Sequence, residues 1–252
     1  MKNETIDDLQ LDGLKLIQKT DNFRFGVDAV LLSDFAKPKK NDRVLDIGTG
    51  TGIIPILIAA KTGAAHITGI EIQPEMAEMA SRSVKMNELS ERINILHGDI
   101  RDWESVFSKG EFDLVVANPP YMSVNSAIKS SSDAKAIARH EIKCTLEDLV
   151  SAAAGVLKPN GKFALIHKPA RLVDILDLFR KNSIEPKLLR FVFSKNDVPP
   201  SMVLVHGTKF GKKELRVKEN LYIFNQDGSY SDEINRIYNR SGSFGKAGEG
   251  IE

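Results

Sequence analysis

The chain has 252 residues, of which 42% are hydrophobic and 27% are charged, and its formal net charge is +1. These proportions are typical of a globular protein with a sizeable core, and the longest apolar run, residues 53–60, is far shorter than the roughly 18 residues that a membrane helix needs. Cys144 is the only cysteine, which excludes an intrachain disulfide or a thiolate metal cluster, and the acidic, polar N-terminus does not resemble a signal peptide, so we expect a soluble, cytoplasmic protein.

The basic side chains are concentrated in the second half of the chain. Residues 118–252 carry 21 Lys and Arg against 15 Asp and Glu, an excess of +6. Some of these cations form a local cluster: Lys209, Lys212, Lys213, Arg216 and Lys218. Clustered cations can follow a phosphate backbone. Lysines that only keep a loop or a strand edge soluble give the same pattern, and both interpretations stay open.

Strand-like and helix-like runs alternate along the chain. Residues 14–18 predict a short strand, and residues 23–32 a loop that enters a helix. Beyond them, strands are predicted at residues 43–47, 66–71, 93–97, 112–117, 162–167, 188–193 and 202–205, helices at residues 53–61, 74–87, 145–157 and 170–181, and a turn at residues 158–161. Thr145, with Glu147 and Asp148 after it, is a candidate helix cap. The alternation indicates an α/β fold with a doubly wound, mostly parallel, seven-stranded sheet.

A glycine-rich loop, Asp46-Ile47-Gly48-Thr49-Gly50-Thr51-Gly52, joins the strand at residues 43–47 to the next helix. Glycines let the backbone turn sharply and approach a ligand without a Cβ in the way, and ligands bind at this carboxyl edge of open α/β sheets. The spacing G-x-G-x-G differs from the G-x-G-x-x-G of dinucleotide-binding folds. The acid shortly before the first glycine repels a pyrophosphate and suits a ligand that carries an amine.

Two more acids stand at the ends of the following strands. Glu71 lies 23 residues after Gly48, where a carboxylate can accept hydrogen bonds from both hydroxyls of a ribose. Asp99 follows the next strand, where it can accept from an exocyclic amine. Acids at three successive strand ends therefore describe a ligand with an amine, a ribose diol and an adenine. S-adenosylmethionine has all three groups, and its sulfonium adds a positive charge.

These motifs resemble those of the class I methyltransferases, which have a Rossmann-like fold. The resemblance implies that S-adenosylmethionine is the cofactor. The chain shows no metal-ligand spacing, so we expect no metal. The resemblance also implies a set of cofactor-binding residues: Asp28, Asp46, Gly48, Thr49, Gly50, Gly52, Glu71, Ile72, Asp99, Ile100 and Asn118.

The strand at residues 112–117 runs into Asn118-Pro119-Pro120-Tyr121. Methylating a conjugated amino nitrogen is difficult because its lone pair is delocalised, and a catalyst helps by accepting hydrogen bonds from both N–H groups. Asn118 offers a side-chain oxygen and Pro119 a backbone carbonyl, whose direction Pro120 restricts. Tyr121 can stack on a flat substrate, an interaction worth about 1–3 kcal/mol. The predicted catalytic residues are Asn118, Pro119 and Tyr121, and Pro120 and Tyr121 are predicted to contact the substrate.

The tetrapeptide is similar to that of amino-methyltransferases, which act on adenine N6 in DNA or RNA, on guanine N2 in rRNA or on glutamine N5 in proteins. By that resemblance the motif specifies the reaction and leaves the substrate open. Glutamine-N5 enzymes carry a helical substrate domain before the glycine-rich strand, for which we expect residues 1–42 to leave no room.

The segment Phe23-Arg24-Phe25-Gly26-Val27-Asp28-Ala29-Val30-Leu31-Leu32 resembles the bacterial family that methylates N6 of adenine 37 in valine tRNA. By that resemblance Asp28 lies near the methionine end of the cofactor, and the partner is RNA, with tRNA preferred. The two phenylalanines equally suit a hydrophobic lid packed on the core. Within residues 122–143, a loop beside the Asn-Pro-Pro-Tyr motif, Arg139 is a candidate substrate-binding residue.

We therefore expect methylation of adenine N6 in tRNA. Methylation of a protein glutamine or of an rRNA guanine is the alternative within the same chemistry, and a non-catalytic cofactor- or RNA-binding protein is the alternative of another class. The intact motif argues against the last, because binding alone needs no pair of acceptors. We divide the chain into an N-terminal extension over the site (residues 1–42), a methyltransferase domain (residues 43–240) and a flexible tail (residues 241–252).

Overall fold

The computed structural model describes residues 4–9, 11, 13–19, 26–64, 66–120 and 144–238. Two short strands, β1 (Glu4–Asp8) and β2 (Lys15–Lys19), form an antiparallel hairpin of their own, and the other described strands belong to one sheet. The predictions for the loop after residue 120, for the aromatic segment before residue 26 and for the tail lie outside the described residues.

The main sheet is mostly parallel. Its described strands are β3 (Arg43–Ile47), β4 (His66–Glu71), β5 (Ile93–His97), β6 (Phe112–Ala117), β7 (Leu157–His167), β8 (Ile184–Phe193), β9 (Met202–Lys209), β10 (Arg216–Val217) and β11 (Leu221–Tyr222). Their order is β10-β8-β9-β7-β6-β3-β4-β5, β11 also pairs with β8, and β9 alone runs against the direction of the others. The predicted number of seven strands is wrong, because the two-residue strands β10 and β11, too short to leave a pattern in the sequence, extend the sheet to nine.

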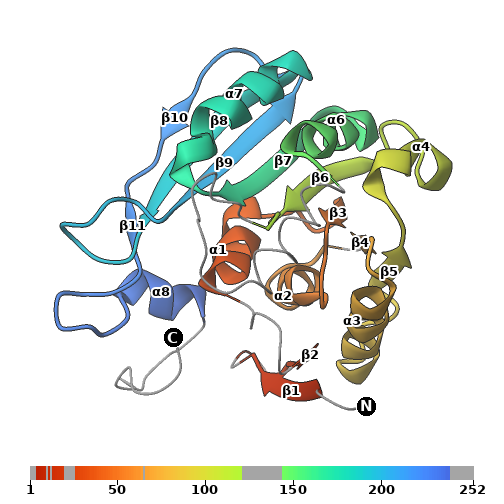
Figure 1. Cartoon of the computed structure of the whole chain (residues 1–252), viewed down its shortest axis with the longest axis horizontal. Coiled ribbons are helices and arrows are strands. Elements are labelled where there is room, and N and C mark those ends of the chain that lie inside the picture. The colour runs from red at the N-terminus through yellow and green to blue at the C-terminus, as the bar shows by residue number, and fades with distance from the viewer. Residues whose placement is uncertain are drawn as a thin grey trace, which may run out of the picture.

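Helices cover both faces of this sheet, which confirms the doubly wound arrangement. The described helices are α1 (Val27–Ala36), α2 (Ile53–Lys61), α3 (Pro74–Met86), α4 (Trp103–Val106), α6 (Leu146–Val156), α7 (Leu172–Lys181) and α8 (Asp232–Ile237), with the 3₁₀ turns η1 (Ile100–Asp102) and η2 (Pro169–Arg171). Helices α1 and α2 lie on one side of the sheet, and α6 and α7 on the other (Figure 1). On β3, Val44 belongs to the core with α1 and α2, and Leu45 to the core with α6 and α7. Because both faces are buried, the apolar residues Val44, Leu45 and Ile47 do not alternate with exposed polar ones, and Asp46 is a buried polar residue within the strand.

One local prediction at α6 is confirmed and its neighbour is wrong. Helix α6 begins at the predicted cap, where the Thr145 hydroxyl accepts from the Asp148 N–H and the Asp148 carboxylate accepts from the Thr145 N–H, at 3.1 and 2.9 Å. This reciprocal pair is a capping box. The turn predicted at residues 158–161 is wrong, because these residues belong to β7, where Asn160 has a φ of 63° and the register between β6 and β7 shifts.

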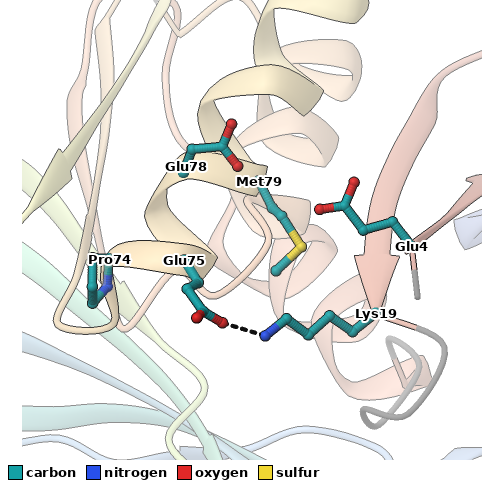
Figure 2. Close-up of a pocket in the computed structure, with 6 residues that line it drawn as sticks. All are labelled: Glu4, Lys19, Pro74, Glu75, Glu78 and Met79. Atoms are coloured by element: carbon teal, nitrogen blue, oxygen red, sulfur yellow. Dashed lines mark hydrogen bonds and ion pairs between the residues drawn. The ribbon is translucent and has the colours of Figure 1, made fainter. Parts of the chain in front are cut away.

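The hairpin β1–β2 is held against α3. Arg82 on α3 donates to both carboxylate oxygens of Glu4, at 2.9 and 2.7 Å. At the start of α3, Lys19 and Glu75 form an ion pair beside a cleft of about 360 Å³ that Glu78 also lines (Figure 2). The sequence predicted only the second strand of the hairpin, because the first is mostly acidic. Since α3 starts just after β4, these contacts bring the N-terminal segment close to the carboxyl end of that strand.

Arg190 ties the last helix to the sheet. Its side chain, on β8, is 6% exposed and donates to both carboxylate oxygens of Glu233 on α8, at 2.8 and 2.7 Å. It also donates to the carbonyl of Glu219, at 2.8 Å. Hydrogen bonding to this guanidinium holds the pKa of the Glu233 carboxyl below its usual range.

We expect Arg190→Met to lower the free energy of unfolding by about 2–4 kcal/mol, because Glu233 loses its partner while it stays partly buried. Arg216→Met is the matched control. Arg216 is 74% exposed and pairs with Glu214 at the surface, and such pairs contribute about 0–1 kcal/mol. Urea unfolding of both variants measures the difference, and equal losses would contradict the role assigned to Arg190.

Candidate functional site

The candidate site lies at the carboxyl ends of β3, β4 and β6. In these parallel strands Ile47 is the Cα partner of both Ile70 and Ala117. The N–H groups of Gly48 and Thr49 both donate to the Ile70 carbonyl, at 2.9 and 3.1 Å, so the end of β3 is tied to the end of β4. The register therefore brings the glycine loop, the end of β4 and the residue after β6 to one edge of the sheet.

The glycine loop, residues 48–52, requires its glycines. Gly48, Gly50 and Gly52 have φ angles of 71°, 56° and 86°, in the left-handed region that other residues rarely adopt. A Cβ on Gly52 would lie 3.1 Å from the Cβ of Ala80 on α3, whereas a Cβ on Gly48 would meet nothing within 4 Å. Gly52 therefore allows close packing of α3, and the space beside Gly48 is open to a ligand.

Asp46 lies on β3 behind this loop and is completely buried. Among the described residues, no hydrogen-bond partner reaches either carboxylate oxygen, and the Thr49 hydroxyl, although near, lies outside hydrogen-bond geometry. Burial, assisted by the Glu71 carboxylate and opposed by the Thr49 hydroxyl, raises the pKa of Asp46 to about 8. A buried acid without a partner is costly to the fold, and it suits a ligand that brings positive charge.

Glu71, at the end of β4, is 5% exposed and holds the glycine loop in place. Its Oε2 accepts from the Gly50 N–H and its Oε1 from the Gln73 N–H, both at 2.9 Å. The sequence does not reveal these two donors, because nearly every residue carries a backbone N–H. Oε1 also accepts from the side-chain Nε2 of Gln73 at 3.4 Å, whereas Oε2 keeps a second acceptor site. The predicted contact with a ribose hydroxyl therefore stays compatible with these bonds at Oε2.

Asp99 follows β5 and caps the turn η1. Its carboxylate accepts from the Arg101 N–H and from the Arg101 Nε, both at 3.0 Å. Ile100, between them, is buried, and the His97 ring contacts the Ile72 carbonyl at 3.2 Å, which joins the ends of β4 and β5. Arg101 is not among the site residues predicted from the sequence, although the spacing Asp-x-Arg at the end of a strand indicates that the two side chains can pair. An exocyclic amine at Asp99 has to share the carboxylate with this guanidinium.

Asn118, Pro119 and Pro120 follow β6 directly. Asn118 and Pro119 are half-buried, and Pro120 is exposed. Ala117, one residue earlier, is paired with the last residue of β3, so Asn118 leaves the sheet next to the glycine loop. Tyr121 and Arg139, the other predicted substrate contacts, lie outside the described residues.

Asp28 lies in the first turn of α1, where its Oδ1 accepts from the Ala29 N–H at 2.9 Å. A Cβ on Gly26 would lie 2.5 Å from that oxygen, so a glycine at this position lets the carboxylate fold back over the start of the helix. The predicted position of Asp28 near the methionine end of the cofactor stays a prediction.

Burial shifts the pKa of several other titratable side chains. Burial raises the pKa of the Cys144 thiol to about 11, with the Asp148 and Asp99 carboxylates acting in the same direction, so the thiol keeps its proton at neutral pH. Burial lowers the pKa of His167 and of His206 to about 4, so both rings are neutral. Within the described ranges, no group of three or more His, Cys, Asp or Glu side chains is placed to hold a metal ion. Nor is any described helix both long and apolar enough to span a bilayer.

Comparisons with known proteins agree with this arrangement. Residues 38–195 match the model of a family described as a methyltransferase domain. A tRNA1(Val) (adenine(37)-N6)-methyltransferase of Porphyromonas gingivalis is 39% identical over 158 residues, which cover 60% of this chain and 61% of that protein. The protein of the same name from Bacteroides fragilis is 27% identical over 214 residues, covering 85% of this chain and 88% of that protein. The chain thus matches less than two thirds of the first relative and most of the second.

Solved structures share the fold. A predicted O-methyltransferase of Agrobacterium tumefaciens gives a TM-score of 0.69 at 22% identity, covering 84% of this chain and 95% of that one. Geranyl diphosphate C-methyltransferase from Streptomyces coelicolor, solved with S-adenosyl-L-homocysteine, gives a TM-score of 0.52 at 14% identity, covering 72% of this chain and 76% of that one. The glycine loop, the acids at the strand ends and Asn118 all fall within the matched residues 38–195, and this chain belongs to the methyltransferase domain family.

Proposed function

We propose that this protein is a cytoplasmic, S-adenosylmethionine-dependent methyltransferase that methylates N6 of an adenine in tRNA, with adenine 37 of a valine tRNA as its substrate. The observation that carries the proposal is that Asn118 and Pro119 follow β6 beside the end of β3, where the glycine loop begins, so a pair of acceptors there would lie near a methyl donor held by that loop. The names of the Porphyromonas and Bacteroides relatives support the choice of substrate.

The residues at the strand ends fit the cofactor. The buried, unpartnered Asp46 suits its positive charge, the Oε2 of Glu71 keeps an acceptor site for a ribose hydroxyl, and the open backbone at Gly48 admits a close approach. Other residues that would hold the cofactor are Asp28, Thr49, Gly50, Ile72, Asp99 and Ile100. When bound, S-adenosylmethionine supplies an electrophilic methyl group on a positively charged sulfur.

Asn118 and Pro119 act on the substrate nitrogen. The Oδ1 of Asn118 and the carbonyl of Pro119 accept hydrogen bonds from the two N–H groups of adenine N6 and favour a pyramidal nitrogen with a free lone pair. Pro119 has no N–H of its own that could compete. Both hydrogen bonds strengthen as the nitrogen becomes positive, so they stabilise the transition state more than the ground state. The methylated nitrogen is acidic and loses its proton to solvent without a strong base.

The domain boundaries remain part of the proposal. The family match begins at residue 38, which supports a catalytic domain that starts near residue 43. Within residues 1–42, the hairpin packs on α3 and α1 packs on the core beside α2, which supports an extension that covers the site. A target adenine must leave its stack to reach this edge, and the loop of a tRNA makes that step easier than a duplex does.

Replacing Asn118 tests the pair of acceptors. We expect Asn118→Ala to lower kcat by about 10²–10³, because one of two transition-state hydrogen bonds is lost. The affinity for S-adenosylhomocysteine, measured by calorimetry, should change by less than about tenfold. Asn196→Ala, at an exposed asparagine after β8, is the matched control and should leave both values unchanged. Full activity of Asn118→Ala would show that the proposed mechanism is wrong.

The substrate can be assigned by transfer of a labelled methyl group to purified tRNA, to rRNA and to a release-factor protein. We expect label only in tRNA, recovered as N6-methyladenosine by mass spectrometry. Label in rRNA as N2-methylguanosine, or in protein as N5-methylglutamine, would replace the proposed substrate. Absence of label from all three would favour a binding protein.

Asp46 predicts an unusual pH dependence of stability. Its pKa is about 8 in the folded chain and 3.8 in a solvated one, so the folded state binds the extra proton between these pH values. The stability from this group is complete below about pH 4 and is lost as the pH rises to about 8, by at most about 1.4 kcal/mol per pH unit. Asp46→Asn should escape this loss. Urea unfolding between about pH 5 and 9 should show its advantage over the wild type growing with pH, whereas a constant difference would contradict the raised pKa.

A further inference from the structure

The basic cluster singled out in the sequence divides into two parts. Lys209, at the end of β9, is only 7% exposed, and its ammonium donates to the carbonyls of Ala154 and Leu157 at the end of α6, at 2.6 and 2.8 Å. A cation there satisfies carbonyls that the helix leaves without partners and offsets its dipole. Lys209 is therefore structural. The other cations of the cluster are exposed: Lys212, Lys213, Arg216 and Lys218.

These four cations alternate with exposed apolar side chains in residues 210–218, which we call the edge strip. Phe210, Leu215 and Val217 are 62%, 43% and 63% exposed. With Glu214 as its only acid, the strip has a net charge of +3. Exposed apolar groups set among like charges on a monomer mark a surface that meets a partner.

Lys212 and Lys213 carry two of the three positive charges of the strip that no described ion pair engages, and Lys218 carries the third. Glu214 is already engaged, since it pairs with Arg216 at 3.0 Å and with Lys187 at 3.9 Å. Among the described residues, no ion pair involves Lys212 or Lys213. The complementary partner is therefore an anion, and two adjacent lysines suit two neighbouring phosphates.

The backbone of the edge strip is fixed although its side chains are exposed. The Phe210 N–H donates to the Ser183 carbonyl and the Lys218 N–H to the Leu189 carbonyl, both at 2.8 Å. Between these two points the Lys212 carbonyl accepts from the Lys187 ammonium at 2.9 Å. The strip is thus anchored to the edge of the sheet at both ends and near its middle, so its backbone has little conformational entropy left to lose on binding.

Phe210 is held outward by an unusual backbone. Its φ is 57°, in the left-handed region that is rare for an aromatic residue. The ammonium of Lys209 lies 5.4 Å from the ring centroid, which leaves most of the ring open to solvent. An open aromatic face beside lysines is the arrangement on which an unpaired base stacks.

The strip lies on the same sheet as the candidate site, at its edge (Figure 1). Only residues 216 and 217 of the strip, in β10, join the sheet, and the order from there to β6, which Asn118 follows, is β10-β8-β9-β7-β6. At about 4.8 Å for each of these four spacings the lateral separation is on the order of 19 Å. Phe210 lies beside Ser183, before β8 begins, whereas Asn118 follows the end of β6, so the two places are also offset along the strands by on the order of 20 Å. A nucleic-acid stem covers the combined distance, on the order of 28 Å, in roughly eight steps of about 3.4 Å.

We propose that the edge strip is a second contact surface for the RNA substrate, in which Lys212 and Lys213 bind backbone phosphates and Phe210 stacks on an unstacked base. This inference rests on the proposed function, because it takes tRNA as the polyanion that reaches both the strip and Asn118. A substrate held at both places is oriented before its target adenine enters the site.

The test uses the full chain with Lys212 and Lys213 both changed to Ser, against the same change at Lys39 and Lys40, an exposed pair before β3. Binding of unmodified tRNA is measured by fluorescence anisotropy at several salt concentrations. We expect the Lys212/Lys213 variant to bind about five- to tenfold more weakly and its slope of log K against log salt to shrink by about 1.4–1.8, as for two lost phosphate contacts. Its kcat at saturating tRNA and its affinity for S-adenosylhomocysteine should be unchanged.

Phe210 is tested separately. Phe210→Ser should weaken tRNA binding by about fivefold or more, whereas Phe210→Tyr, which keeps the ring, should bind as the wild type does.

An unchanged salt slope in the Lys212/Lys213 variant would overturn the proposal, and so would an equal loss of tRNA affinity in the Lys39/Lys40 control. If the edge strip binds a protein partner instead, the salt slope of tRNA binding will be unchanged in the Lys212/Lys213 variant. Binding is measured without turnover, so the two proposals can fail separately. If the Lys212/Lys213 change reduces the salt slope of tRNA binding but the protein does not methylate tRNA, the proposed function alone is refuted. If the protein methylates tRNA but the change leaves the salt slope unaltered, the role of the edge strip alone is refuted.

Discussion

The parallel pairing of β3 with β4 on one side and β6 on the other is the constraint on which the candidate site depends. With Ile47 opposite both Ile70 and Ala117, three chain segments leave the sheet together. A shift of one residue in either register would turn every side chain of that strand to the other face, so Val44 and Leu45 would exchange cores. The two cores therefore protect the register, and the register holds the glycine loop, Glu71 and Asn118 in one place.

The site carries features that do not favour folding. Asp46 is buried without a described partner, and the loop in front of it needs three residues in the left-handed region. Other buried charges have partners, as with Arg190 and Glu233 or with Lys209 and the end of α6, whereas the Lys61 ammonium at the end of α2 is buried without a described hydrogen-bond partner as well. Asp46 differs from Lys61 in lying at an open strand end, and ligand sites are where such unsatisfied groups are retained. Binding of a cation would offset part of the cost.

Burial separates residues that look equivalent in the sequence. Lys209 and Lys212 belong to one basic cluster, yet the first closes the end of a helix and the second faces solvent. Asp46, Glu71 and Asp99 are three acids at successive strand ends, yet the first lacks a described partner, the second is bound to backbone N–H groups and the third is paired with Arg101. These differences arise from neighbours that are distant in sequence or carried by the backbone. They decide which charge is available to a ligand.

Much of the fold could be predicted from the sequence because its causes are local. The spacing of apolar residues located the long strands and helices, Thr145 and Asp148 marked the start of α6, and the glycines marked the sharp turn after β3. The strands β1, β10 and β11 were not predicted, because they are short or polar and form only by pairing with the edge of another strand. By itself the sequence determined the class of fold, and it singled out the candidate acids and the proposed pair of acceptors at Asn118 and Pro119. Only the tertiary structure decided that Asp46 lacks a described partner, that Arg101 shares Asp99 and that Lys209 is structural, because burial and pairing depend on which distant segments the sheet brings together.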